Sequence, residues 1–218
     1  MRTDSVKSFG LSGLGFAPTD LGINSTIAFT HALNLAERGF QSFRSHGDVA
    51  TESMRAEATS DVAALRAMYQ DDPTADWRVL CGKAVGLWVL DIPRPRDLEW
   101  LERDMGASEK KTWTVGRESG GVQQWYRGET GPEYTMNESL HATHAHLKAS
   151  APIPGSIHAR TGERFHWLNG LAPGQCDLAT FSLRWQLGLP RLNGLRITDS
   201  PVHRAEFRAE GNLPAKWK

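Results

Sequence analysis

Gly86-Leu87-Trp88-Val89-Leu90-Asp91-Ile92-Pro93 is the stretch that decides the fold of this chain. Its apolar run predicts a buried strand that ends on the carboxylate of Asp91. Side chains on a strand alternate between faces, so an acid two residues later would stand beside Asp91 and share a cation with it. Pro93 occupies that position. Asp91 is therefore either the remnant of a metal site or an acid that ends a strand and caps the turn at 94–96.

The composition is that of an ordinary globular protein. The chain has 218 residues, of which 39% are apolar and 23% charged, enough for one large domain or a two-lobed one. Lys plus Arg equal Asp plus Glu at 25 each, so no global field draws the protein to a polyanion. Cys81 and Cys176 are isolated thiols, which indicates a cytoplasmic location and no disulfide framework. No apolar stretch reaches the about 18–20 residues of a membrane span.

Helix and strand signals alternate along the chain and predict an α+β fold. Helices are expected from the Asn24-Ser25 cap to Gly39, over 61–71, over 97–105 and over 175–187. Strands are expected at 40–43, 77–80, 85–91, 112–115, 122–126, 146–153 and 165–167, with the second and third forming a hairpin about Gly82. Residues 44–58 and 128–140 are polar connections. The predicted organisation is a flexible arm at 1–23, a domain at 24–188 and a C-terminal extension at 189–218.

The order of these elements and three short motifs resemble a known family. Leu90-Asp91 is followed by Ser119-Gly120-Gly121-Val122, then by Pro154-Gly155-Ser156-Ile157-His158, and then by Gly162 and Phe165-His166-Trp167. Over roughly 25–168, the chain resembles the N-terminal domain of bifunctional DNA primase/polymerases, the prim-pol branch of the archaeo-eukaryotic primase superfamily. The resemblance implies a two-lobed prim-pol fold, with an RRM-like module and mixed or antiparallel sheets flanked by helices. It also implies metal-dependent nucleotidyl transfer in a plasmid, phage or other mobile-element replication system.

The chain departs from the family pattern where the pattern binds metal and triphosphate. The family has a second acid two residues after the position of Asp91, and this chain has Pro93. A family histidine that resembles a triphosphate contact corresponds to Gln123, and a later acid corresponds to His146, with the basic Lys148 kept two residues on. Two carboxylates clamp the divalent ions in such chemistry, and neutral groups replace them poorly on Mg²⁺. We therefore expect a prim-pol fold with a degenerate catalytic site.

These features predict a protein that acts by binding nucleic acid or a nucleotide, with a replication or host protein as a possible further partner. No cofactor is expected, and Mg²⁺ or Mn²⁺ would be needed only by an active enzyme. The residues that the resemblance and local chemistry assign to phosphate or nucleotide binding are Arg117, Ser119, Gly120, Gly121, Lys148, Ser156 and His158.

Other interpretations of the same residues stay open. An active enzyme with a rearranged site would recruit Asp97, Asp104 or the cluster His141, His144 and His146, and a third hypothesis is a host-interaction protein on the same fold. The Ser-Gly-Gly and Pro-Gly-Ser motifs are also typical of ordinary turns. Arg127 either joins Arg117 and Lys148 in a phosphate patch or belongs to a mixed surface. The tryptophans either stack bases or fill the core; they are Trp77, Trp88, Trp100, Trp113, Trp125 and Trp167.

Overall fold

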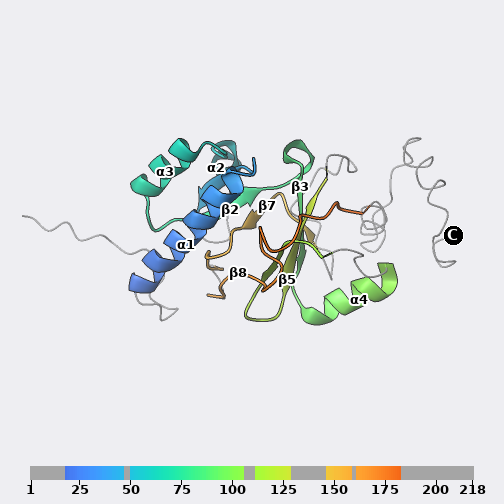
Figure 1. Cartoon of the computed structure of the whole chain (residues 1–218). Helices are drawn as coiled ribbons and strands as arrows, with labels where there is room; N and C mark the ends of the chain where they lie inside the picture. Colours follow the sequence, from blue (N-terminus) through green and yellow to red (C-terminus); the bar gives the residue numbers. More distant parts are fainter. Residues whose placement is uncertain (1–17, 47–49, 106–110, 129–145, 159–160, 183–218) are drawn as a thin grey trace, which may run out of the picture.

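A computed structural model describes residues 18–46, 50–105, 111–128, 146–158 and 161–182, which form two antiparallel sheets with helices at their flanks (Figure 1). The first sheet has the order β1-β2-β7 and the second the order β6-β3-β5-β4-β8. The predicted α+β class is confirmed. The strands are β1 (Ser42–Ser45), β2 (Asp76–Leu80), β3 (Leu87–Ile92), β4 (Thr114–Gly116), β5 (Val122–Arg127), β6 (His146–Leu147), β7 (Ser150–Pro152) and β8 (His166–Trp167).

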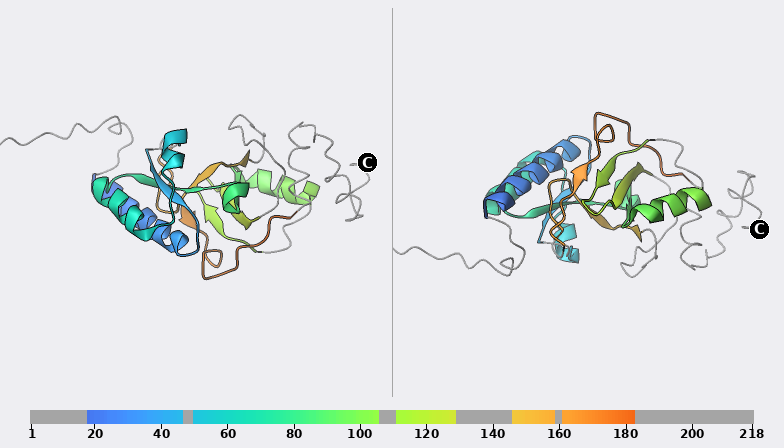
Figure 2. Two further views of the ribbon diagram at one scale, coloured as in Figure 1. Left: turned by 90° about the horizontal axis from the view of Figure 1, so that it is seen from above. Right: turned by 90° about the horizontal axis from the view of Figure 1, so that it is seen from below.

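Two helices, α1 (Pro18–Ala36) and α3 (Val62–Asp71), lie side by side against the first sheet (Figure 2). The helix predicted over 61–71 is confirmed as α3, and Asp61 caps it, since its carboxylate accepts hydrogen bonds from the backbone of residues 63 and 64. The predicted Asn24-Ser25 cap of α1 is wrong, because α1 begins at Pro18 and extends into the segment expected to be an arm. Ser25 is a buried helix residue whose hydroxyl donates to the carbonyl of Ala75 at 2.8 Å.

The remaining helices are α2 (Glu52–Ala56), the 3-10 turn η1 (Lys83–Val85) and α4 (Pro95–Met105). The α2 helix lies in the segment predicted to be a polar connection, where Thr51 caps it by accepting from the Met54 N–H. The α4 helix begins at Pro95, the position where a proline loses no intrahelical hydrogen bond, and Asp97 lies in its first turn rather than before it. Figure 2 shows α4 at the opposite end of the molecule from α1 and α3.

The chain crosses between the sheets where a hairpin was predicted. Strands β2 and β3 follow each other closely, but β2 pairs with β1 and β7, whereas β3 pairs with β5 and β6. Gly82 makes the turn with a φ of +119° and donates its N–H to the Leu87 carbonyl at 2.7 Å. The hairpin prediction is therefore wrong, and the same kind of crossing recurs between β6 and β7.

The second sheet is covered on both faces, which explains the continuous apolar run of β3. One face contributes Leu87, Val89 and Trp125 to a core shared with α1 and the first sheet. The opposite face contributes Trp88, Leu90 and Ile92 to a second core that includes Leu101 of α4. Because side chains alternate along a strand, Asp91 shares the face of Leu87 and Val89, toward the first sheet.

The segment after β8 does not form the helix predicted for 175–187, as far as residue 182. Ala179 and Phe181 are buried while Thr180 between them is exposed, which is the alternation of an extended strand. Arg127 of β5 pairs with this segment, donating to the Ala179 carbonyl and accepting from the Phe181 N–H, both at 2.8 Å. Residues 183–187 and the predicted C-terminal extension at 189–218 lie outside the described residues, as does the polar insertion except for residue 128.

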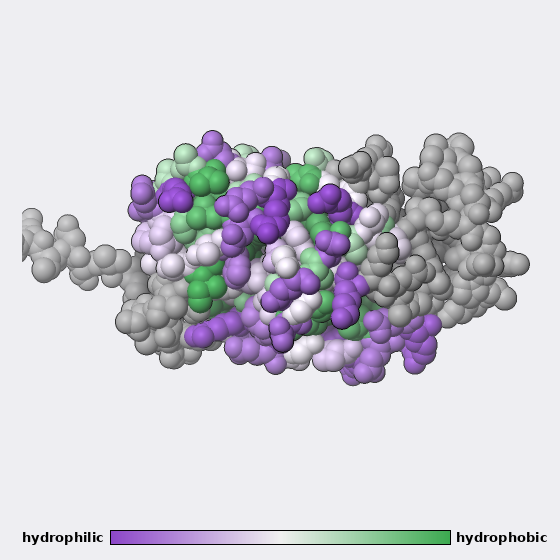
Figure 3. Space-filling model, viewed as in Figure 1, coloured by the Kyte–Doolittle hydropathy of each residue, from purple (hydrophilic) through white to green (hydrophobic). Residues whose placement is uncertain are grey.

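On the face shown in Figure 3, hydrophilic and hydrophobic residues are interspersed. No helix within the described ranges is long and apolar enough to cross a bilayer.

Candidate functional site: a buried carboxylate held by two cations

Asp91 lies in the middle of the second sheet, between the two strands that carry the other positions singled out in the sequence. Gln123 of β5 is its register partner on one side, and His146 of β6 is its partner on the other. Pro93 follows directly after the end of β3, and its carbonyl abuts Gly121. The positions that the resemblance aligned with catalytic residues therefore converge on one part of the sheet. The side chain of His146 lies outside the described atoms.

Two basic side chains contact the Asp91 carboxylate. Arg117 forms an ion pair with Oδ1, and Lys148 Nζ lies 3.2 Å from Oδ2. The side chains of Asp91 and Arg117 are 7% and 11% exposed, so both charges are largely removed from water. The Gln123 amide, itself buried, donates from Nε2 to Asp91 Oδ1 at 3.4 Å. Charge and hydrogen bonding thus stabilise Asp91 as an anion in the core, since an unpaired buried carboxylate would be costly.

The donor set around Asp91 does not fit a divalent metal ion. Mg²⁺ and Mn²⁺ prefer several oxygen ligands, usually from more than one carboxylate. Here both carboxylate oxygens face cationic or N–H donors, and Pro93 supplies no side-chain ligand. Within the described ranges, no group of three or more His, Cys, Asp or Glu side chains is placed to hold a metal.

The motif Ser119-Gly120-Gly121 forms the turn of the β4–β5 hairpin. Arg117 donates its N–H to the Gly121 carbonyl at 2.9 Å, and Gly120, with a φ of +84°, donates to the Arg117 carbonyl at 3.0 Å. A Cβ on Gly121 would lie 2.4 Å from the Pro93 carbonyl oxygen, so only glycine lets the two backbones approach. The turn interpretation is confirmed, and phosphate binding by this turn remains a prediction.

Glu163 already occupies part of this turn with a negative charge. Its Oε1 accepts the Ser119 N–H at 2.9 Å, and its Oε2 accepts the Thr161 hydroxyl at 3.0 Å. The hydrogen bond from the Ser119 side chain is the largest of the effects that lower the pKa of Glu163, and Thr161, the Ser119 N–H and the charge of Arg117 act in the same direction. The Arg117 guanidinium also lies 5.6 Å from the centre of the Phe165 ring. Arg117 thus links two acids, its ion-pair partner Asp91 and Glu163, and together with Lys148 these four residues form the Asp91 cluster.

The Pro154-Gly155-Ser156 motif packs into the scaffold. Gly155 has a φ of +96°, and a Cβ there would lie 2.5 Å from the Ala28 nitrogen of α1. Ser156 is 1% exposed, accepts from the Trp77 N–H at 3.2 Å and donates to the Trp77 carbonyl at 2.9 Å. These contacts give Ser156 a structural role, and its predicted contact with a nucleotide finds no support among them. His158 is half-buried, and its Nδ1 accepts the Thr161 N–H at 3.3 Å.

Several alternatives from the sequence are resolved by these positions. Asp91 does not cap the turn at 94–96, because its carboxylate bonds to Arg117, Lys148 and Gln123 instead. Asp97 is buried and held bidentately by Arg94, with N–O distances of 2.5 and 2.9 Å, so it is committed to its own helix start. The three cations of the predicted phosphate patch do not lie together. Arg127 is the last residue of β5, four residues after Gln123, which pairs with Asp91.

The tryptophans fall mainly in the core. Four of the six are buried, namely Trp77, Trp88, Trp113 and Trp125. Trp167 is half-buried and stacks edge-on against Trp113 and Trp125. His141 and His144 lie outside the described residues, as do the side chains of Trp100 and Asp104.

Sequence reasoning missed Glu163 and Phe165 as neighbours of Arg117. Phe165 belongs to the Phe165-His166-Trp167 motif but was given no role at the site, and Glu163 lies in no motif. The pairing of β4 with β8 brings Phe165 to Arg117, and the hydrogen bond from the Ser119 N–H holds Glu163 against the β4–β5 turn.

Two antiparallel sheets flanked by helices define an α+β protein. The family model for the N-terminal domain of bifunctional DNA primase/polymerases matches residues 32–179, most of the chain, and the chain belongs to that family. No curated protein matches the chain. Family membership supports a DNA primase/polymerase-like protein, from a family whose activity typically depends on metal ions and involves nucleic acid and nucleotides.

Proposed function

We propose that this protein is a primase/polymerase-like replication protein of a mobile element or phage that does not catalyse nucleotidyl transfer and acts by binding nucleic acid or nucleotides. The observation that carries the proposal is the pair of cations on Asp91. A two-metal site requires an excess of negative charge to hold its ions. The cluster of Asp91, Glu163, Arg117 and Lys148 is balanced instead, with one base for each acid.

Binding is the activity that such a site retains. The side chain of Lys148 is 37% exposed, so its ammonium group is accessible to a phosphate while it remains near Asp91. In the β4–β5 turn, the Gly120 N–H is taken by the Arg117 carbonyl, and the Ser119 N–H is the one that already binds an anion, the Glu163 carboxylate. A phosphate at this place would compete with Glu163 for the Ser119 N–H.

Primer extension tests the catalytic half of the proposal. The purified full chain is incubated with a primed template, labelled deoxynucleotides and either Mg²⁺ or Mn²⁺. We expect no incorporation above that of the Asp91→Ala variant. Metal-dependent extension that disappears in Asp91→Ala would overturn the proposal, because Asp91 would then act on the metal rather than on Arg117 and Lys148.

Fluorescence anisotropy with labelled single-stranded DNA tests the binding half. We expect Lys148→Gln to weaken binding and to reduce the slope of log K against log salt by about 0.7, the value for one lost phosphate contact on a single strand. Arg66→Gln, on the exposed face of α3, is the matched control and should leave both quantities unchanged. If the wild-type chain binds neither DNA nor nucleotide but retains a stoichiometric protein partner from its host, the host-interaction hypothesis replaces this one.

A further inference from the structure

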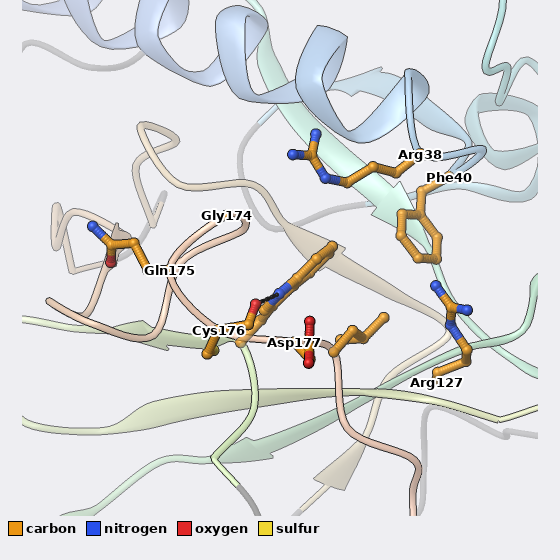
Figure 4. Close-up of a pocket in the computed structure, with 9 residues that line it drawn as sticks. Arg38, Phe40, Arg127, Gly174, Gln175, Cys176 and Asp177 are labelled. Atoms are coloured by element: carbon orange, nitrogen blue, oxygen red, sulfur yellow. Dashed lines mark hydrogen bonds between the residues drawn. The ribbon is translucent and has the colours of Figure 1, made fainter.

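A hollow of about 490 Å³ lies away from Asp91, between the end of α1, the end of β5 and the loop that follows β8 (Figure 4). Gln123 of β5 pairs with Asp91, whereas Arg127 on the same strand pairs with Leu87, four residues earlier on β3. At about 3.3 Å per residue, the two positions are roughly 13 Å apart along the strand. The hollow is therefore separate from the cluster described above. It is lined by Arg38, Phe40, Trp113, Arg127 and residues 174–178.

Two arginines enter the hollow from different elements. Arg38 follows the end of α1, where Gly39, with a φ of +84°, and the hydrogen bond from the Phe40 N–H to the Leu35 carbonyl terminate the helix. Its guanidinium donates from one nitrogen to the Asn34 carbonyl at 2.6 Å, which orients the rest of the group. Arg127 comes from the last residue of β5, on the other side of the hollow (Figure 4). Neither arginine forms an ion pair with a carboxylate in the described part of the chain.

The walls between the arginines are aromatic and fixed in place. Phe40 and Trp113 pack edge to face, with ring centres 5.9 Å apart. The Trp113 indole N–H donates to the Cys176 carbonyl at 3.0 Å, which attaches the loop to β4 and its neighbours. The side chain of Gln175 accepts the N–H groups of residues 170 and 172, at 2.9 and 3.3 Å. The loop is thus held by its own hydrogen bonds, so the hollow is preformed.

The charges indicate what the hollow accepts. Arg38 and Arg127 contribute two positive charges, and the exposed carboxylate of Asp177 on the loop contributes one negative charge. Lys111 lies close enough to act on the Cys176 thiol, so the surroundings of the hollow carry a net positive charge, which suits a phosphate group. Guanidinium groups bind phosphate oxygens through paired N–H donors. Phe40 and Trp113 are buried and form the rigid floor of the hollow. The volume is within the range of small-molecule sites.

We propose that this hollow is a second phosphate-binding site, in which Arg38 and Arg127 hold one phosphate group of a mononucleotide or of a single-stranded nucleic acid beside Phe40 and Trp113. The site does not depend on the cluster at Asp91, and it does not require that the protein lacks polymerase activity.

The test uses the full chain and two probes, AMP by calorimetry and a labelled single-stranded dT12 oligonucleotide by anisotropy at low salt. We expect Arg38→Gln and Arg127→Gln each to weaken binding of at least one probe by fivefold or more. Both side chains are exposed, so neither change disturbs the core. Arg66→Gln is the matched control and should change binding by less than twofold.

The Asp177→Asn variant tests the proposal in the opposite direction, because it should strengthen binding. Removing a negative charge beside the bound phosphate should strengthen binding of the same probe by twofold or more. An effect on AMP alone would identify a nucleotide site, and an effect on dT12 would identify a strand contact. If wild type binds neither probe, or if both arginine variants bind as wild type does, the proposal is wrong. Weakened binding in Asp177→Asn would also contradict it. The Lys148→Gln variant probes the Asp91 cluster and not this hollow. The two binding proposals can therefore be refuted independently.

Discussion

The Asp91→Asn variant tests whether the central carboxylate is a structural anion. In the wild type, Asp91 offsets the charges of Arg117, whose side chain is 11% exposed, and of Lys148, whose side chain is 37% exposed. Removing one partner of a buried ion pair costs about 3–5 kcal/mol. The lower end applies here because Lys148 is partly solvated. We therefore expect a loss of about 3 kcal/mol, which corresponds to a fall in Tm of roughly 6–12 °C for a chain of this size.

If Asp91 were a metal-binding acid, the Asp91→Asn change would raise the stability of the metal-free protein instead of lowering it. Acids gathered to hold metal repel one another when no metal is present, so neutralising one of them relieves repulsion and stabilises the fold. The measurement is thermal and urea unfolding, followed by circular dichroism in the presence of a chelator.

The matched control is Asp71→Asn, which removes an exposed ion pair to Arg44 and should cost no more than about 1 kcal/mol. An Asp91→Asn variant as stable as wild type, or more stable, would refute the assignment. So would a clear rise in the Tm of wild type with millimolar Mg²⁺, because a ligand that binds only the folded state stabilises it.

Three further predictions concern the scaffold around this cluster. Gly121→Ala should destabilise the fold by about 2 kcal/mol in urea unfolding, because its Cβ would press on the Pro93 carbonyl, 2.4 Å away. The pKa of Glu163 is lowered in the fold, so its carboxylate stabilises the protein at pH values above its ordinary pKa of 4.5. This stabilisation is lost as the pH falls through the folded pKa. The difference in stability between the wild type and Glu163→Gln should therefore shrink in that acidic range. Burial raises the pKa of Cys81 to about 12, and the pKa of the more accessible Cys176 is raised as well, so iodoacetamide at pH 8 should modify Cys176 slowly and Cys81 only after unfolding.

The elements that local patterns specify were predictable from the sequence. The α3 helix is indicated by a capping acid followed by apolar residues at helical spacing. The burial of β3 is indicated by its apolar run. The β4–β5 hairpin was indicated by two strand patterns on either side of a Gly-Gly turn. These elements depend on contacts between residues close in sequence, and such contacts leave a local signature.

The errors lie where distant contacts override the local pattern. Strands β2 and β3 read as a hairpin, but which strand each one joins is decided by β5 and β7, far along the chain. Residues 175–182 contain enough apolar positions to suggest a helix, yet pairing with Arg127 holds them extended. For the candidate site, the position of Gln123 and His146 beside Asp91 followed from alignment to a family. The part played by Glu163 did not follow, because a hydrogen bond across 44 residues has no sequence signature.

The presence of Asp91 does not require a metal to explain it. The positions next to Asp91 carry a neutral glutamine and a proline. These two positions provide no second acid that would bind a metal ion together with Asp91, so Arg117 can pair with its carboxylate. A buried Arg117 requires a nearby anion, and a buried Asp91 requires a nearby cation. Each residue therefore offsets the desolvation cost of the other. This mutual dependence predicts that Asp91→Asn and Arg117→Gln together cost less than the sum of the two single changes. A double-mutant cycle by urea unfolding should give a coupling energy of about 1–3 kcal/mol. Additive effects would mean that the two charges stabilise the fold separately, and the structural account of Asp91 would fail.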